Sequence, residues 1–253
     1  MGEVRLPSMA AKRNAIVLAL LANAHVAHAY RPFDSTDAAV ADPGEIEIEL
    51  GPVAYTDSPH ASITEAPVLT VNAGLVNRWE AVLDASRAIT RSANENDIET
   101  VETALLLKRV LRAGVLQEQT DWSVATEFGV LLPTVNADDG YGATLALIGS
   151  QEVGRTLIHV NAGIAQNRDG RAELFGGLII EAVASAPVRP VAELTFDYER
   201  GTDTRSAGAL VGVIWQPGEN LNFDMAVRAV REEHEWSYEG RVGLTWAFAL
   251  VRR

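Results

Sequence analysis

The last stretch of the chain, residues 236–250, alternates between apolar and polar positions with a period of two. Its odd positions are polar, charged or small, whereas its even positions carry Trp236, Tyr238, Gly240, Val242, Leu244, Trp246, Phe248 and Leu250. Successive side chains of a β-strand point to opposite faces, so one face is apolar with aromatic residues near both ends. A transmembrane barrel strand needs this arrangement, because aromatic girdles flank an apolar outer band while the lumen is wet. The alternative is one strand of a soluble β-sandwich.

The same rhythm recurs along the rest of the chain and predicts strands of about ten residues separated by turns, as in bacterial barrels. Twelve such segments are predicted, at residues 45–55, 67–75, 79–90, 100–112, 122–132, 141–152, 156–166, 172–185, 191–200, 207–215, 221–231 and 236–250. The sequence therefore predicts an all-β fold: a transmembrane antiparallel up-and-down β-barrel of twelve strands.

The fourth of these segments fits two templates. Over residues 97–111 the apolar side chains Ile98, Val101, Leu105 and Val110 fall nearly on one helical stripe, so an amphipathic helix fits as well as a strand. The position of this segment between tight hairpins favours a strand.

The predicted connections fall into two classes that alternate along the chain. The longer ones are expected outside the cell, at residues 56–66, 91–99, 113–121, 134–140, 167–171, 201–206 and 232–235. The tight ones are expected in the periplasm, at residues 76–78, near Gly154, at 187–190 and at 216–220. The connection at 113–121 breaks this alternation, so one connection in the scheme is misplaced.

The N-terminus has the pattern of a secretory signal. Lys12 and Arg13 precede an apolar run at residues 15–22, and Ala27-His28-Ala29 offers small residues at the positions that a signal peptidase reads. We expect cleavage before Tyr30, which makes residues 1–29 the signal peptide and residues 30–253 the barrel. Met9 is an alternative start to Met1. The sequence has no cysteine, so an exported chain must be held by its strand ladder and packing.

The charge of the chain excludes some partners and describes the predicted lumen. The net charge of −13 becomes −15 when Glu3, Arg5, Lys12 and Arg13 leave with the signal, which argues against nucleic acid as a partner. Polar side chains on the lumen face are expected to line a pore that favours cations or neutral solutes. The predicted pore-lining residues are Glu127, Glu173, Glu181, Glu193, Asp197, Glu199, Asp224, Arg228, Glu239 and Arg241.

Catalytic and metal chemistry find little support in the sequence. Of the histidines beyond residue 29, His60 and His234 fall in predicted loops and His159 on the lumen face of the seventh strand. A lipase-type site needs a serine beside such a histidine, and spacing does not bring Ser123 or Ser185 to His159. The histidines are scattered and cysteine is absent, so we assign no catalytic residue, metal or cofactor.

Several short motifs, in order, resemble a known family. Residues 31–38 (RPFDSTDA) and 43–51 (PGEIEIELG) resemble the opening of outer-membrane proteins labelled with the MetA pathway of phenol degradation. Residues 74–80 (GLVNRWE) resemble a hairpin of that family, and residues 129–134 (GVLLPT) resemble one of its strand ends. The chain departs from the family at Leu131, where a basic residue is usual, and at Val135, where glycine is common. The resemblance covers most of the chain after residue 29.

The resemblance implies a porin-like barrel that takes up small, sometimes aromatic, compounds. The expected function is thus an outer-membrane channel, passive or gated by its substrate, with outer-membrane lipid and a small-molecule solute as partners. Two alternatives stay open at this point: a barrel enzyme acting on envelope lipid, and a sealed structural barrel. The sequence leaves the solute, the oligomeric state and the conductance of the lumen undetermined.

Overall fold

The computed structural model describes residues 31–59, 61–92, 96–134, 140–182 and 187–250. The predicted signal peptide, its cleavage site, both candidate start positions, His60 and Ser185 lie outside these ranges. The strands are β1 (Glu45–Asp57), β2 (Ala61–Gly74), β3 (Trp79–Ser92), β4 (Asn96–Arg112), β5 (Ser123–Leu131), β6 (Gly142–Val153), β7 (Thr156–Gln166), β8 (Ala172–Ala182), β9 (Val188–Glu199), β10 (Thr204–Gly218), β11 (Leu221–Glu232) and β12 (Glu235–Ala249).

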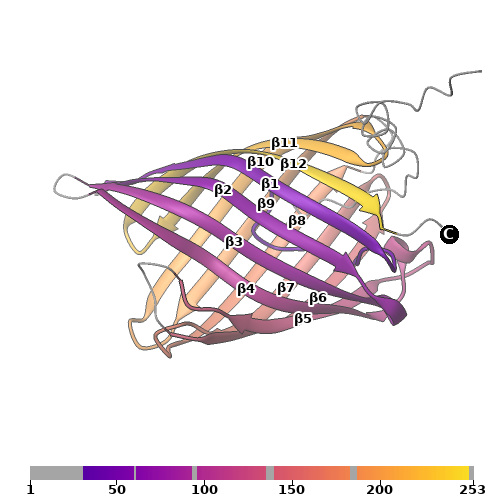
Figure 1. Cartoon of the computed structure of the whole chain (residues 1–253), viewed down its shortest axis with the longest axis horizontal. Helices are drawn as coiled ribbons and strands as arrows, with labels where there is room; N and C mark the ends of the chain where they lie inside the picture. Colours follow the sequence, from indigo (N-terminus) through magenta and orange to yellow (C-terminus); the bar gives the residue numbers. More distant parts are fainter. Residues whose placement is uncertain (1–30, 60, 93–95, 135–139, 183–186, 251–253) are drawn as a thin grey trace, which may run out of the picture.

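Each strand pairs antiparallel with its neighbours in sequence, and β1 pairs with β12 to close the sheet into a barrel (Figure 1). The closing register places Glu45 opposite Ala249 and Asp57 opposite Tyr238. This confirms the prediction of a twelve-stranded up-and-down barrel. Closure matters physically because it leaves no strand edge with unpaired main-chain groups in an apolar environment.

The ambiguous fourth segment is a strand. Leu105 of β4 pairs with Leu83 of β3 on one side and with Val130 of β5 on the other. A helix at this position would leave the facing edges of β3 and β5 without hydrogen-bond partners, so the barrel environment decides what the local pattern leaves open.

The two faces of the strands follow the predicted alternation. On β12, Trp236 and Tyr238 are exposed on the outer face, whereas Thr245 and Ala247 are buried on the inner face. Leu194 on β9 and Met225 on β11 are more than half exposed in the same outward direction. The barrel thus has an apolar outside and a polar inside.

Aromatic side chains gather near both ends of the barrel. Trp215 stacks on Phe223 and Trp246 packs beside Phe248 near the end at which β1 begins and β12 ends, here called the terminal end. Trp236 stacks with Tyr238 at the other end, here called the opposite end. Two aromatic belts around an apolar band are typical of an outer-membrane barrel.

Two predicted connections were wrong. Residues 56–66 are not a long loop, because β2 already begins at Ala61 and Pro67 falls at a bulge between Glu65 and Val68. Proline lacks a main-chain N–H, and a bulge is a place where the ladder tolerates that loss. The connection after β4, which contains the 3-10 helix η2 (Val115–Gln117), lies at the terminal end with the tight turns, since antiparallel strands must alternate direction.

A second 3-10 helix, η1 (Val76–Arg78), joins β2 to β3. Within the described residues, no helix is long and apolar enough to cross a membrane.

Candidate functional site: the lumen and the segment inside it

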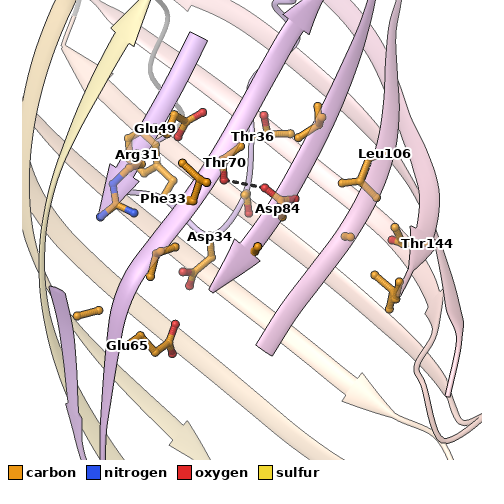
Figure 2. Close-up of a pocket in the computed structure, with 18 of the residues that line it drawn as sticks. Arg31, Phe33, Asp34, Thr36, Glu49, Glu65, Thr70, Asp84, Leu106 and Thr144 are labelled. Atoms are coloured by element: carbon orange, nitrogen blue, oxygen red, sulfur yellow. Dashed lines mark hydrogen bonds between the residues drawn. The ribbon is translucent and has the colours of Figure 1, made fainter. Parts of the chain in front are cut away.

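The residues that precede β1 lie inside the barrel. Residues 31–44, here called the lumen segment, contact inward-facing side chains of strands all around the wall. Figure 2 shows Arg31, Phe33, Asp34 and Thr36 of this segment within the barrel, beside wall residues such as Glu49. Sequence reasoning used residues 31–38 only as a family motif and missed this location.

Much of the contact runs through the main chain of the lumen segment. The carboxylate of Glu193 on β9 accepts hydrogen bonds from the N–H groups of Asp34 and Ser35, both at 2.8 Å. The amide of Asn161 on β7 accepts from the N–H of Thr36 at 3.3 Å and donates to the carbonyl oxygen of Thr36 at 2.7 Å. Two wall side chains therefore satisfy three successive residues of the segment.

The following residues are held in the same way. The N–H of Ala38 donates to Ser150 Oγ on β6 at 2.9 Å, and its carbonyl oxygen accepts from Gln117 Nε2 at 3.0 Å. The N–H of Ala41 donates to Glu80 Oε2 on β3 at 2.6 Å. Ala38 is fully buried in an apolar cluster with Ile148 and neighbouring alanines, so the segment is packed as well as hydrogen-bonded.

Charged side chains fix the first part of the segment. Asp34 Oδ2 lies 2.7 Å from Arg228 Nε on β11, and Asp34 Oδ1 lies 2.8 Å from Arg241 Nη1 on β12. Arg241 also donates to the carbonyl oxygen of Pro32 and forms a bidentate pair with Glu239, at 2.6 and 2.8 Å. Two arginines and two carboxylates thus form a charge-balanced network on this side of the wall.

Arg31 lies in a space left by two glycines. Its guanidinium is 3.4 Å from Asp224 Oδ2 and donates to the carbonyl oxygen of Val242 at 3.1 Å. A Cβ atom on Gly51 would lie 2.8 Å from Arg31 Nη1, and one on Gly243 would overlap the guanidinium. The absence of a side chain at Gly51 and Gly243 therefore makes room for the guanidinium.

The lumen segment borders both a packed part of the interior and a cavity. Toward the terminal end the wall side chains are packed: Lys108, Ser150, Asn222 and Thr245 are at most 1% exposed. Lys108 Nζ lies 3.1 Å from Thr36 Oγ1 and 3.5 Å from Asp37 Oδ1, which ties this packed part to the segment. On its other side the segment borders a cavity of about 680 Å³, whose lining reaches from Asn72 near the terminal end to Glu173 near the opposite end.

Away from the arginine network, carboxylates outnumber arginines among the charged residues of the cavity wall. Carboxylates from several strands line it, and Figure 2 shows Glu49, Glu65 and Asp84 among them, with Thr70 donating to Asp84 at 2.6 Å. Phe33 of the segment and Phe175 of β8 add two aromatic rings to the lining. The charged lining residues of the cavity are Arg31, Asp34, Glu49, Glu65, Asp84, Glu127, Arg168, Glu173, Arg228, Glu239 and Arg241.

Some of the residues predicted to line a pore lie at the cavity, some contact the lumen segment, and the others contact neighbouring wall side chains. Those at the cavity are Glu127, Glu173, Arg228, Glu239 and Arg241. Glu193 and Asp224 instead hold the lumen segment.

The other three predicted pore-lining residues contact neighbouring side chains. Glu181 lies 3.0 Å from His159, Asp197 accepts a hydrogen bond from Ser206 at 2.9 Å, and Glu199 accepts from Arg171, Thr202 and Asn167 near the opposite end. Several residues that fix the segment are absent from the predicted set, among them Arg31, Asp34, Glu80, Ser150 and Asn161.

His159 belongs to a buried chain of polar groups. Its Nδ1 lies 2.8 Å from Ser150 Oγ and its Nε2 lies 3.0 Å from Glu181 Oε1. Ser150 is the serine beside this histidine, whereas Ser123 accepts a hydrogen bond from the N–H of Leu116. Ser150 is fully buried and its oxygen accepts from the N–H of Ala38, so this arrangement anchors the lumen segment.

Metal binding is not supported by the arrangement of the side chains. Within the described ranges, no group of three or more histidine, aspartate or glutamate side chains has a geometry that could hold a metal ion.

No protein-family model matches the chain, and no curated protein matches its sequence. Solved structures do match its fold. An outer membrane channel of Pseudomonas putida F1 (COG4313) has a TM-score of 0.67 at 10% identity, covering 85% of this chain and 100% of that one.

Two porins match the fold as well. The NanC porin has a TM-score of 0.54 at 10% identity, covering 79% of this chain and 98% of that one. The KdgM porin has a TM-score of 0.51 at 11% identity, covering 80% and 99%. The chain therefore has the fold of porin-like outer-membrane barrels.

Proposed function

We propose that the protein is an outer-membrane channel for small solutes whose lumen is narrowed by its own N-terminal segment. The observation that carries this proposal is a polar cavity of about 680 Å³ inside a closed barrel with an apolar outer face, ending at the lumen segment. A water-filled interior enclosed by an apolar band is the arrangement of a porin. The folds of the similar channels and porins support the same proposal.

The terminal end faces the periplasm in this proposal, and the cavity opens toward the cell exterior. Both chain ends of bacterial barrels lie on the periplasmic side, where the connecting turns are short. Residues 1–29 act as the signal peptide, and the mature protein begins at Tyr30. N-terminal sequencing of the protein from outer-membrane fractions tests this point, and a mature chain that still begins at Met1 or Met9 would contradict it.

The size and lining of the cavity suggest the class of solute. Cavities of about 300–1,000 Å³ accommodate small organic molecules. Phe33 and Phe175 offer ring faces, and the surrounding carboxylates offer hydrogen-bond acceptors. Small polar or aromatic compounds fit this lining, in agreement with the resemblance of residues 31–38 to the family labelled with phenol degradation.

Planar-bilayer conductance of the refolded mature chain, residues 30–253, tests the channel. We expect small, flickering conductance steps, because the segment occupies much of the lumen cross-section. The same chain with both Arg31→Ala and Asp34→Ala should give larger and longer openings. Absence of conductance in both proteins, with folding shown by circular dichroism and by the heat-dependent shift in electrophoretic mobility, would overturn the proposal.

A further inference from the structure

The wall of the lumen recognises the segment largely through its main chain. Among the described residues, at least eight hydrogen bonds join main-chain N–H or C=O groups of residues 32–41 to side chains of the barrel. The side chains come from five strands and from η2, so they surround the segment. Such contacts depend on the path of the main chain, which bends at residues 34, 35 and 38, and little on which side chains it carries.

Asn161 and Glu193 show how this recognition works. Asn161 pairs with both the N–H and the carbonyl oxygen of Thr36, as a neighbouring β-strand would. Glu193 accepts two successive N–H groups with its two oxygens. Hydrogen bonds to a charged partner are stronger than neutral ones, so this pair of contacts is a main attachment point.

Side-chain contacts add selectivity at a few positions. Asp34 is bound by Arg228 and Arg241, and Arg31 fits the space at Gly51 and Gly243. Ser35 is accommodated because Gly177 of β8 has no side chain that would overlap Ser35 Oγ. These positions favour a peptide with a cation three residues before a carboxylate and a small residue after it.

We infer that the lumen is a peptide-binding site, and that residues 31–41 are its resident, covalently attached ligand. A short peptide of this pattern would bind the same side chains once the resident segment leaves. If the channel function proposed above holds, such a free peptide also blocks the pore in place of the resident segment.

Because the segment is covalently attached to the barrel, a free peptide competes with it only weakly. A tethered ligand has an effective concentration of about millimolar, so a free peptide competes poorly with it. The test therefore separates the segment from the barrel only after folding. A protease site is inserted between Ala41 and Asp42 of the mature chain, the protein is folded in detergent micelles, and it is then cut.

The cut protein is incubated with a fluorescent synthetic peptide of residues 31–41 (RPFDSTDAAVA). We expect the cut fragment to stay with the barrel in size-exclusion chromatography and to exchange for the labelled peptide with saturation at one peptide per barrel. A peptide methylated at the main-chain nitrogen of Ser35 should bind at least about tenfold more weakly, since it loses a hydrogen bond to Glu193. A peptide with Ser35→Ala keeps the main-chain contact with Glu193 and loses only the contact of its hydroxyl, so it should bind more tightly than the methylated peptide.

Two wall variants separate specific binding from adsorption to the micelle. Asn161→Ala should weaken peptide binding about tenfold, because two hydrogen bonds to Thr36 are lost. Thr144→Ala, which changes the cavity lining away from these contacts, should leave binding unchanged. Equal binding of the parent and the Ser35-methylated peptide, or loss of the fragment without uptake of labelled peptide, would overturn the inference.

A second measurement covers the case in which the inserted site resists cleavage. Hydrogen exchange at the amides of Ser35 and Thr36 is followed in the uncut mature chain carrying Asp34→Ala, which loosens the segment. Added peptide at millimolar concentration should accelerate this exchange by displacing the segment, and no acceleration would count against a peptide site.

Conductance distinguishes this inference from the channel proposal. The cut protein freed of its fragment should conduct more, and the peptide should restore the block. Peptide binding without any conductance would support the peptide site and contradict the channel function. Conductance without peptide binding or block would support the channel function and contradict the peptide site.

Discussion

Asp34 and Arg241 are 207 residues apart in the sequence, yet Asp34 Oδ1 lies 2.8 Å from Arg241 Nη1. Arg228 contacts the other oxygen of the same carboxylate at 2.7 Å. Side chains of the last two strands, β11 and β12, thus hold the lumen segment at Asp34. This contact ties the position of the lumen segment to closure of the barrel, because β12 must pair with β1 to bring Arg241 into place.

Replacing Asp34 should open the lumen. Asp34→Ala removes both ion pairs, and the loss of hydrogen bonds to charged partners costs about 1.5–3 kcal/mol each in favourable cases. We expect larger single-channel conductance and a shift toward anions, since Arg228 and Arg241 lose a carboxylate. Asp57→Ala, at the exposed end of β1, is the matched control and should leave the conductance of the wild type unchanged. Unchanged conductance in Asp34→Ala would show that Asp34 does not hold the segment closed.

The two glycines of β12 should respond differently to alanine. A Cβ atom at Gly243 overlaps the Arg31 guanidinium, whereas one at Gly240 meets nothing within 4 Å. Gly243→Ala should therefore displace Arg31 and increase protease access to residues 31–41, while Gly240→Ala should behave as the wild type. Limited proteolysis followed by mass spectrometry measures the difference. Equal cleavage of the two variants would mean that Arg31 does not occupy this space.

A pair of substitutions on β6 tests the orientation of the wall. Leu147 is 56% exposed on the outer face, and Thr144 lines the cavity on the inner face. Leu147→Arg should lower the free energy of unfolding in lipid by about 2–4 kcal/mol, because a guanidinium is poorly solvated in the apolar band. Thr144→Arg should cost much less. Urea titration of both variants in vesicles is the measurement, and similar costs would contradict the assignment of faces.

The charge of the cavity should make the channel prefer cations. Carboxylates around a narrow polar passage hold a negative potential that attracts cations and is weakened by salt. Reversal potentials in asymmetric KCl should show this preference, and it should grow as the salt concentration falls. Replacing Glu65, Asp84 and Glu173 with their amides should reduce it, whereas Glu219→Gln in an exposed turn should not.

Glu193 is unsuitable for testing the charge of the pore, because it holds the lumen segment. A wild-type channel that prefers chloride would refute the charge argument without refuting the barrel.

We expect Ser150 to hold the lumen segment in place and not to act as a catalytic nucleophile. Ser150→Ala removes the acceptor for the Ala38 N–H and the contact with His159, so the segment should loosen and conductance should rise. Release of fatty acid from phospholipid vesicles by the wild type should equal the background of empty vesicles. Hydrolysis that depends on Ser150 would instead favour the barrel enzyme that the sequence left open.

The alternation of apolar and polar residues determined the strands and their faces. This pattern is local, because side-chain direction in a strand changes with every residue, and β9, β11 and β12 can be predicted from it alone. The strand count also followed, since turn residues separate the alternating stretches. β4 was ambiguous because helical and strand periods fit it equally well, and its partners β3 and β5 decided between them.

The tertiary structure alone decided what the lumen contains. Residues 31–44 have no period that marks them as an internal segment, and the groups that hold them lie as many as 211 residues away along the chain. A buried N–H or carboxylate must find a partner, but the sequence does not say which one, because closure of the barrel determines which side chains meet. For this reason Glu193 and Asp224 resembled pore-lining charges in the sequence, whereas in the folded barrel they bind the start of the same chain.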